Sequence, residues 1–147
     1  MTTPNREDQV RRLYYELQLM EGTAQTLQQR LQVLTQAQAE LNVAKQSLET
    51  IGEAEEGTDI LVPTGSGTFV HAKLGNPEKL IVNVGAEVLV DMTIDDAKEN
   101  VQGRLEEVDK ATISVSQQLE QILAQMQVHQ DGVNRLSAQI RGEQPRV

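Results

Sequence analysis

The chain has 147 residues, about the length of one domain, with 38% hydrophobic and only 2% aromatic residues. An ordinary compact globule needs more apolar and aromatic side chains for its core, so a simple globular fold is not expected. Acidic side chains number 22 and basic ones 13, which gives a net charge of −9. Binding to nucleic acid or to an anionic membrane depends on clustered Lys and Arg, and is therefore not expected either.

The sequence contains no cysteine, which excludes disulfides, thiolate chemistry and Cys-ligated zinc. The first ten residues lack the apolar segment of a signal peptide, and no run of about 18 apolar residues is long enough to cross a bilayer. We therefore expect a cytoplasmic protein.

The first half of the chain has a single helical pattern. Apolar residues recur alternately three and four positions apart, as in the seam of a coiled coil. The seam positions are Val10, Leu13, Leu17, Met20, Ala24, Leu27, Leu31, Leu34, Gln38, Leu41, Lys45 and Leu48. The pattern predicts a helix over roughly residues 6–51, about 68 Å long at 1.5 Å per residue. Gly52 and then Gly57 are expected to end it.

An acidic linker, residues 52–59, leads into two predicted β-hairpins over about residues 60–92. Turns are expected at 64–67 within the first hairpin and at 85–87 within the second. Four short strands cannot close a core of their own, and their unpaired edges favour pairing with other chains. We expect the apolar hairpin residues to form this oligomer contact, namely Ile60, Val62, Phe69, Val70, Leu80, Val82, Val84, Val88 and Val90.

A second helical seam follows the hairpins. Thr93 is a predicted N-cap, with Asp95 and Asp96 in the first helical turn. The helix is expected over roughly residues 94–141. Its seam positions are Ile94, Ala97, Val101, Leu105, Val108, Thr112, Val115, Leu119, Ile122, Met126, His129, Val133, Leu136 and Ile140.

Two seams of equal length on either side of a small β insert indicate that the helices fold back on each other. The predicted fold class is mainly α with a β insert: a long antiparallel two-helix coiled coil joined by two β-hairpins that oligomerise into a larger β platform. Facing residues should have numbers that add up to about 146, which places Met20 opposite Met126 and Gln38 opposite Val108. The whole chain, residues 1–147, is expected to form one such domain.

Apolar residues outside the seam gather near the chain ends, which we call the tip. Tyr14, Tyr15 and Leu19 lie at outward positions of the first helix, and Val128 does so in the second. With the adjacent seam residues they make an apolar band wider than a seam needs, formed by Leu13, Tyr14, Tyr15, Leu17, Leu19 and Met20. Such patches commonly mark interaction sites. Val33 and Val43 are also apolar and off the seam, but they lie far along the chain from the tip. Single apolar residues are common on protein surfaces, so one such residue does not by itself mark a site.

Residues for catalysis or metal binding are not arranged in any recognisable motif. His71 and His129 fall in different elements, and His129 is expected to be a tolerated seam residue. The Gly65-Ser66-Gly67 turn lacks the Lys-Ser/Thr of a phosphate-binding loop. We therefore expect no enzyme activity, no cofactor and no metal.

The hairpin segment, ILVPTGSGTFVHAKL at 60–74 and LIVNVGAEVLVDMTIDDA at 80–97, together with the two long seams, resembles the alpha class of prefoldin subunits. The presence of two hairpins indicates the alpha class, because beta-class subunits have a single hairpin. The turn residues that match are Pro63, Gly65, Gly67 and Gly85.

The resemblance implies an ATP-independent holdase that binds unfolded polypeptides and passes them to a group II chaperonin. It implies an assembly of two alpha and four beta subunits whose hairpins form a double β-barrel and whose coiled-coil tips grip clients. It also adds residues from both helix ends to the client-binding tip, namely Val10, Val133, Leu136 and Ile140. Two alternatives remain from the sequence: a coiled-coil scaffold or tether, and a non-catalytic subunit that shapes an enzyme.

Overall fold

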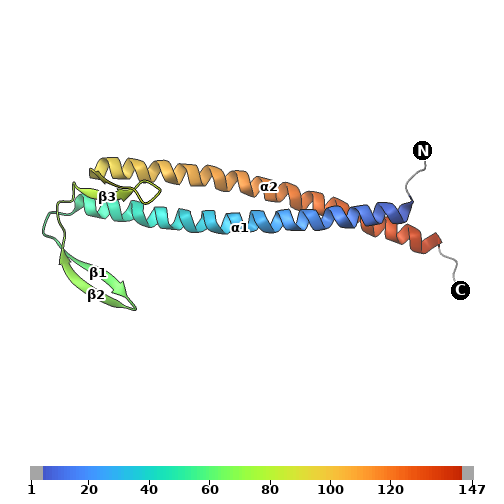
Figure 1. The fold of residues 1–147 in the computed structure, drawn as a ribbon, viewed down its shortest axis with the longest axis horizontal. Helices are drawn as coiled ribbons and strands as arrows, with labels where there is room; N and C mark the ends of the chain where they lie inside the picture. Colours follow the sequence, from blue (N-terminus) through green and yellow to red (C-terminus); the bar gives the residue numbers. More distant parts are fainter. Residues whose placement is uncertain (1–4, 144–147) are drawn as a thin grey trace. The chain divides into compact units, whose positions relative to one another are not determined.

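The structure is a computed structural model that describes residues 5–143. Figure 1 shows the two helices and the hairpins between them. In chain order the elements are α1 (Arg6–Glu53), β1 (Asp59–Gly65), β2 (Thr68–Lys73), β3 (Leu80–Asn83), β4 (Leu89–Met92) and α2 (Ile94–Glu143). Contacts divide the chain into two units. We call residues 5–35 with 110–143 the terminal unit and residues 36–109 the hairpin unit.

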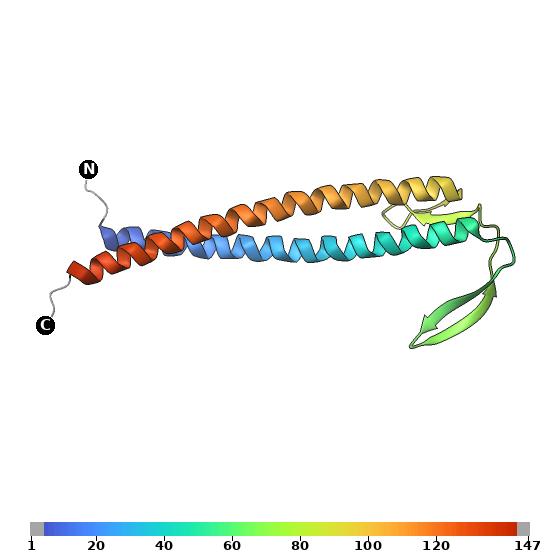
Figure 2. The same cartoon turned by 180° about the vertical axis from the view of Figure 1, so that it is seen from behind.

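In the terminal unit the start of α1 packs against the end of α2 in the opposite direction, as Figure 2 shows for the blue and red segments. The Glu16 carboxylate meets the His129 ring, and a Cβ added to Gly132 would lie 3.3 Å from Leu13 Cδ1. The residue numbers in both pairs total 145, one less than the sequence-based register. The predicted antiparallel pairing of two long helices around two hairpins is confirmed.

The hairpin unit contains the end of α1 and the start of α2. The Asp96 N–H donates a hydrogen bond to Thr93 Oγ1 at 3.2 Å, so Thr93 is the N-cap of α2 as expected. The first helix was expected over roughly residues 6–51, and α1 extends two residues farther, to Glu53. A Cβ at Gly52 would lie 3.2 Å from Lys98 Nζ and 3.4 Å from Ile94 Cγ1, so the end of α1 lies close to the first turns of α2.

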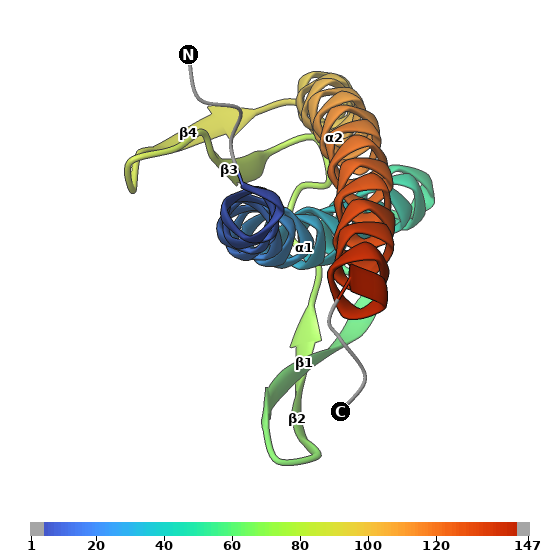
Figure 3. The same ribbon diagram turned by 90° about the vertical axis from the view of Figure 1, so that its right-hand side faces the viewer.

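The four strands form two separate two-stranded antiparallel sheets, drawn apart from each other in Figure 3. In the first, Val62 pairs with Val70, and a register irregularity lies between Pro63 and Gly65. In the second, Val82 pairs with Val90. Both turns fall within the predicted segments, and Gly65, Gly67 and Gly85 adopt positive φ there.

Burial follows the seam. In the part of the chain that the structure describes, every buried hydrophobic residue is a predicted seam position: Leu17, Ala24, Leu27, Ile94, Ala97, Val101, Leu105, Val115 and Val133. Off-seam apolar residues such as Val33 and Val43 are exposed. The alternating spacing therefore identified the face along which each helix packs.

Candidate functional site

The terminal unit brings residues from both chain ends together, and the packing at its centre is apolar. Leu17 and Val133 are buried, and Leu13 packs against Gly132. An open groove of about 260 Å³ beside them is lined by Leu17, Leu123 and Met126, with polar residues at its edge. The expected pairing of Met20 with Met126 stays a prediction.

The ten predicted tip residues differ in accessibility. Leu17 and Val133 are buried, so they hold the two helices together and offer little surface to a ligand. Half-buried positions are Val10, Leu13, Met20, Leu136 and Ile140. Fully exposed positions are Tyr14, Tyr15 and Leu19, with 54%, 63% and 57% of their surface accessible. The three exposed residues are the ones that a ligand reaches without any rearrangement.

Two exposed apolar residues of α2, Ile113 and Leu123, were not singled out from the sequence. Both belong to the terminal unit, as does Val128, which was expected to point outward and does. Their heptad positions, outside the alternating three-four seam, were the signal that could have identified them. The exposed apolar surface of the unit therefore extends over both helices.

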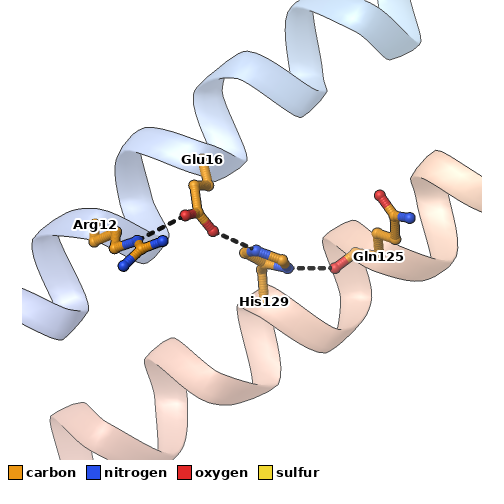
Figure 4. A network of polar contacts seen from close by, with 4 residues as sticks. All are labelled: Arg12, Glu16, Gln125 and His129. Atoms are coloured by element: carbon orange, nitrogen blue, oxygen red, sulfur yellow. Dashed lines mark hydrogen bonds and ion pairs between the residues drawn. The ribbon is translucent and has the colours of Figure 1, made fainter.

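A polar network crosses the helix pair in the same unit (Figure 4). His129 Nε2 lies 2.7 Å from Glu16 Oε2, and Arg12 Nε donates to Glu16 Oε1 at 3.0 Å. These hydrogen bonds, first that of His129 and then that of Arg12, lower the pKa of Glu16 below its ordinary value. His129 is thus more than a tolerated seam residue, since its ring has a specific partner on the facing helix.

The hairpins carry a second apolar surface. Of the nine residues predicted for the oligomer contact, Leu80 and Val82 are half-buried and the other seven are exposed in this chain. Phe69, at 58% accessible, is the largest of them. An isolated two-stranded sheet is only marginally stable in water. Its edge strands have unpaired backbone groups and its apolar side chains are exposed, so the hairpins are expected to be more stable in contact with another chain.

Inside the hairpin unit, two open grooves are lined on one side by hairpin residues and on the other by helix residues. One, of about 530 Å³, lies between β3 and the helix residues Leu48, Ala97 and Val101, with Arg104 at its border. The other, of about 540 Å³, lies between β1 and the outer face of α1, where Val43 and Ile51 line it. The exposed Val43, isolated in the sequence pattern, therefore belongs to an apolar groove.

Comparison with known proteins places these features in a family. The family model for "Prefoldin subunit" matches residues 20–139. The chain belongs to the prefoldin family. Two relatives are the prefoldin alpha subunits of Thermococcus onnurineus, 37% identical over 69% of this chain and 70% of the relative, and of Pyrococcus horikoshii, 36% identical over 76% and 74%. The prefoldin alpha subunit of Methanoregula boonei is 31% identical over 81% of this chain and 77% of its own length.

A solved structure described as filamentous PFD from Methanocaldococcus jannaschii is similar in fold, with a TM-score of 0.50 and 19% identity over 82% of this chain and 93% of the other. The relatives place the chain among the prefoldin alpha subunits, as the hairpin sequences indicated. Prefoldins are a non-enzymatic chaperone family with a coiled-coil architecture, so a chaperone role follows from membership.

Residues 5–143 of this prefoldin chain contain no group of three His, Cys, Asp or Glu side chains that could hold a metal ion. The two histidines belong to different elements, with His71 exposed on β2 and His129 in the polar network of the terminal unit. Neither described helix combines the length and the apolar content that crossing a membrane requires.

Proposed function

We propose that this prefoldin alpha subunit is an ATP-independent holdase that binds unfolded polypeptides through the apolar tip residues of its terminal unit. The observation that carries the proposal is the exposure of Tyr14, Tyr15 and Leu19 on adjacent turns of α1. Hydration of exposed apolar side chains is unfavourable. Contact between these side chains and the apolar side chains of a non-native chain removes them from water and lowers the free energy of the complex.

The half-buried tip residues complete this surface. Val10, Leu13 and Met20 lie on α1, and Leu136 and Ile140 lie on α2. In the proposal they make contact with larger clients, and buried Leu17 and Val133 join only when the helix ends separate. Each contact is weak, but several tips in one assembly hold a client through their high effective concentration.

We further propose that the hairpins assemble this chain with prefoldin beta subunits into a hexamer of two alpha and four beta subunits, located in the cytoplasm. The support is the exposure of the apolar strand residues together with the open edges of both two-stranded sheets. Each client would then be passed to a group II chaperonin, with no role for nucleic acid or a membrane.

Client binding is tested with the assembled hexamer and a denatured client whose aggregation is followed by light scattering. Changing Tyr14, Tyr15 and Leu19 together to Ser should abolish most of the protection while leaving the hexamer intact. The matched control is Val33→Ser, which removes a similarly exposed apolar side chain of α1 outside the tip. Undiminished protection by the triple variant would overturn the client-binding proposal and favour a scaffold.

Assembly is tested by native mass spectrometry after co-expression with a beta subunit. The wild-type chain should give the mass of two alpha and four beta subunits. The paired residues Val62 and Val70 are the positions to change, because they lie side by side on one face of the first hairpin. Changing both residues to Asp should prevent formation of the hexamer. An unchanged mass of the assembly would refute the proposal that the hairpins form the contact between subunits.

A further inference from the structure

His129 occupies a position in which both of its ring nitrogens face oxygen atoms. Nε2 lies 2.7 Å from Glu16 Oε2 on α1, and Nδ1 lies 2.9 Å from the carbonyl oxygen of Gln125 on its own helix. A carbonyl oxygen and an ionised carboxylate both only accept hydrogen bonds. The two contacts are therefore hydrogen bonds at the same time only when both ring nitrogens carry a proton.

A neutral imidazole has one proton and loses one of these bonds in either tautomer. If the proton is on Nδ1, the lone pair of Nε2 faces the Glu16 carboxylate. If it is on Nε2, the lone pair of Nδ1 faces the Gln125 carbonyl. Either case places two acceptors within about 3 Å of each other, which is repulsive, so the ring has to move away from one of them.

The charged groups near His129 come from both helices. On α1 it faces Glu16, and beyond that carboxylate lies Arg12. On α2, Asp131 accepts a hydrogen bond from Gln127. The residues one turn away from His129 on its own helix are uncharged: Gln125, Met126, Gly132 and Val133. The side chains of His129 and Glu16 are 21% and 33% exposed, so their attraction is screened less than that of a fully solvated pair.

We propose that His129 is a protonation-dependent clamp in the terminal unit, whose imidazolium joins Glu16 of α1 to the Gln125 carbonyl of α2 and which loosens when the proton leaves. Among the common side chains, imidazole is the one that in general changes its charge between about pH 5 and pH 8. Glu16 stays ionised throughout that range, because its pKa is lowered. Because acid favours the doubly protonated ring, the clamp tightens as the pH falls and loosens as the pH rises.

The clamp itself does not depend on client binding, but its effect on holding rests on the proposed function. Glu16 lies between Tyr15 and Leu17 in the sequence, and Gly132, one turn from His129, contacts Leu13. A loosened clamp should expose Leu13 and Leu17 more often. Holding of apolar clients is then expected to be stronger at about pH 8 than at about pH 6.

The clamp is tested by hydrogen exchange with mass spectrometry on the assembled hexamer at about pH 6 and about pH 8. Exchange is expressed as protection relative to the unfolded peptide, which removes the intrinsic pH dependence. Protection around Glu16 and His129 should fall severalfold at the higher pH. His129→Gln and Glu16→Gln should each abolish this difference, whereas Arg12→Gln should retain it.

The segments around Gln38 and Asp109 provide an internal control, because their hydrogen bond between helices involves no histidine. Their protection should not change between the two pH values. A wild-type protein without the pH response, or a His129→Gln protein that retains it, would overturn the clamp. The two Gln variants are independent, so failure of one to fold leaves the other as the test.

The aggregation assay at both pH values then tests the effect on holding. Stronger protection at the higher pH, lost in His129→Gln, supports the link. The link would be overturned if the protein protected its client from aggregation equally at both pH values while its hydrogen exchange still responded to pH. The proposed function is tested separately by the Tyr14, Tyr15 and Leu19 variant, so the two failures are distinguishable.

Discussion

Gln38 donates a hydrogen bond from Nε2 to Asp109 Oδ1 over 2.6 Å, joining the two helices of the hairpin unit. Gln38 is one of the two polar positions in the seam of α1 and is half-buried. The sequence-based register placed Val108 opposite it, one residue from the observed partner. A polar seam residue with one suitable partner fixes the register, because a shifted helix would leave the amide without its acceptor.

This hydrogen bond should contribute about 1 kcal/mol to the free energy of unfolding. A double-mutant cycle with Gln38→Leu and Asp109→Ala measures it, using urea denaturation at fixed protein concentration. The two changes should be non-additive by about that amount, because either one removes the same bond. Strictly additive effects would show that the contact does not stabilise the helix pair.

Sequence spacing was sufficient for the seams because helical periodicity is local information: each buried residue of the described chain, such as Leu27 or Val115, is a predicted seam position. The Thr93 cap and the two hairpin turns were also found from local signals. The two-residue extension of α1 to Glu53 was not expected, because a glycine near a helix end indicates a stop without fixing the last helical residue.

The polar network of the terminal unit was missed for a related reason. Periodicity places His129 in the seam, but the bond to Glu16 depends on a register accurate to one residue and on the rotamers of both side chains. The sequence-based register is off by that one residue at this pair. Burial of Leu17 and Val133, in contrast, agrees with their seam positions, and exposure of Tyr14 agrees with its outward position.

Gly22 and Gly132 provide a matched pair of helical glycines in the terminal unit. A Cβ at Gly22 would meet no atom within 4 Å, whereas one at Gly132 would lie 3.3 Å from Leu13 Cδ1. Gly22→Ala should therefore raise the free energy of unfolding by about 1 kcal/mol through helix propensity alone. Gly132→Ala should gain less, because Leu13 has to shift.

Thermal unfolding of the two alanine variants checks this prediction. The expected order of midpoints is Gly22→Ala highest, then Gly132→Ala. Equal midpoints would show that Leu13 accommodates the added methyl group without cost, and that this end of the helix pair is loosely packed.

The turn between β3 and β4 contains two non-glycine residues in the left-handed region, Ala86 at φ 47° and Glu87 at φ 60°. The Val88 N–H closes the turn on the Gly85 carbonyl at 2.9 Å. Two central residues with positive φ are typical of a type I′ turn, for which Asn-Gly is the preferred sequence.

Replacing Ala86 by Asn and Glu87 by Gly should stabilise this hairpin by about 1 kcal/mol. Slower native-state hydrogen exchange at the Val88 amide is the measurement. Glu87→Ala is the control, because it removes the charge but keeps the Cβ and should give no such gain. If that control protects Val88 as much as the Asn-Gly pair, backbone strain is not the cause.

The pKa of Glu16 gives the last prediction. It is lowered first by the hydrogen bond from His129 and next by that from Arg12. A folded-state pKa below the unfolded one means that Glu16 stabilises the fold above its unfolded pKa, and that this contribution is lost as the pH falls through the folded pKa. His129→Leu should therefore raise the pKa of Glu16 more than Arg12→Gln does, and should reduce the acid-dependent loss of stability.

Titration of the Glu16 carboxyl carbon by NMR, in protein labelled on glutamate, measures both shifts, and unfolding as a function of pH measures the linkage. Because leucine in the seam can alter stability by packing alone, the slope of stability against pH is compared rather than its absolute value. In a Glu16→Gln background, His129→Leu should leave the acid slope unchanged. A larger rise of the Glu16 pKa in Arg12→Gln would assign its lowering to the contact within α1 rather than to the one between helices.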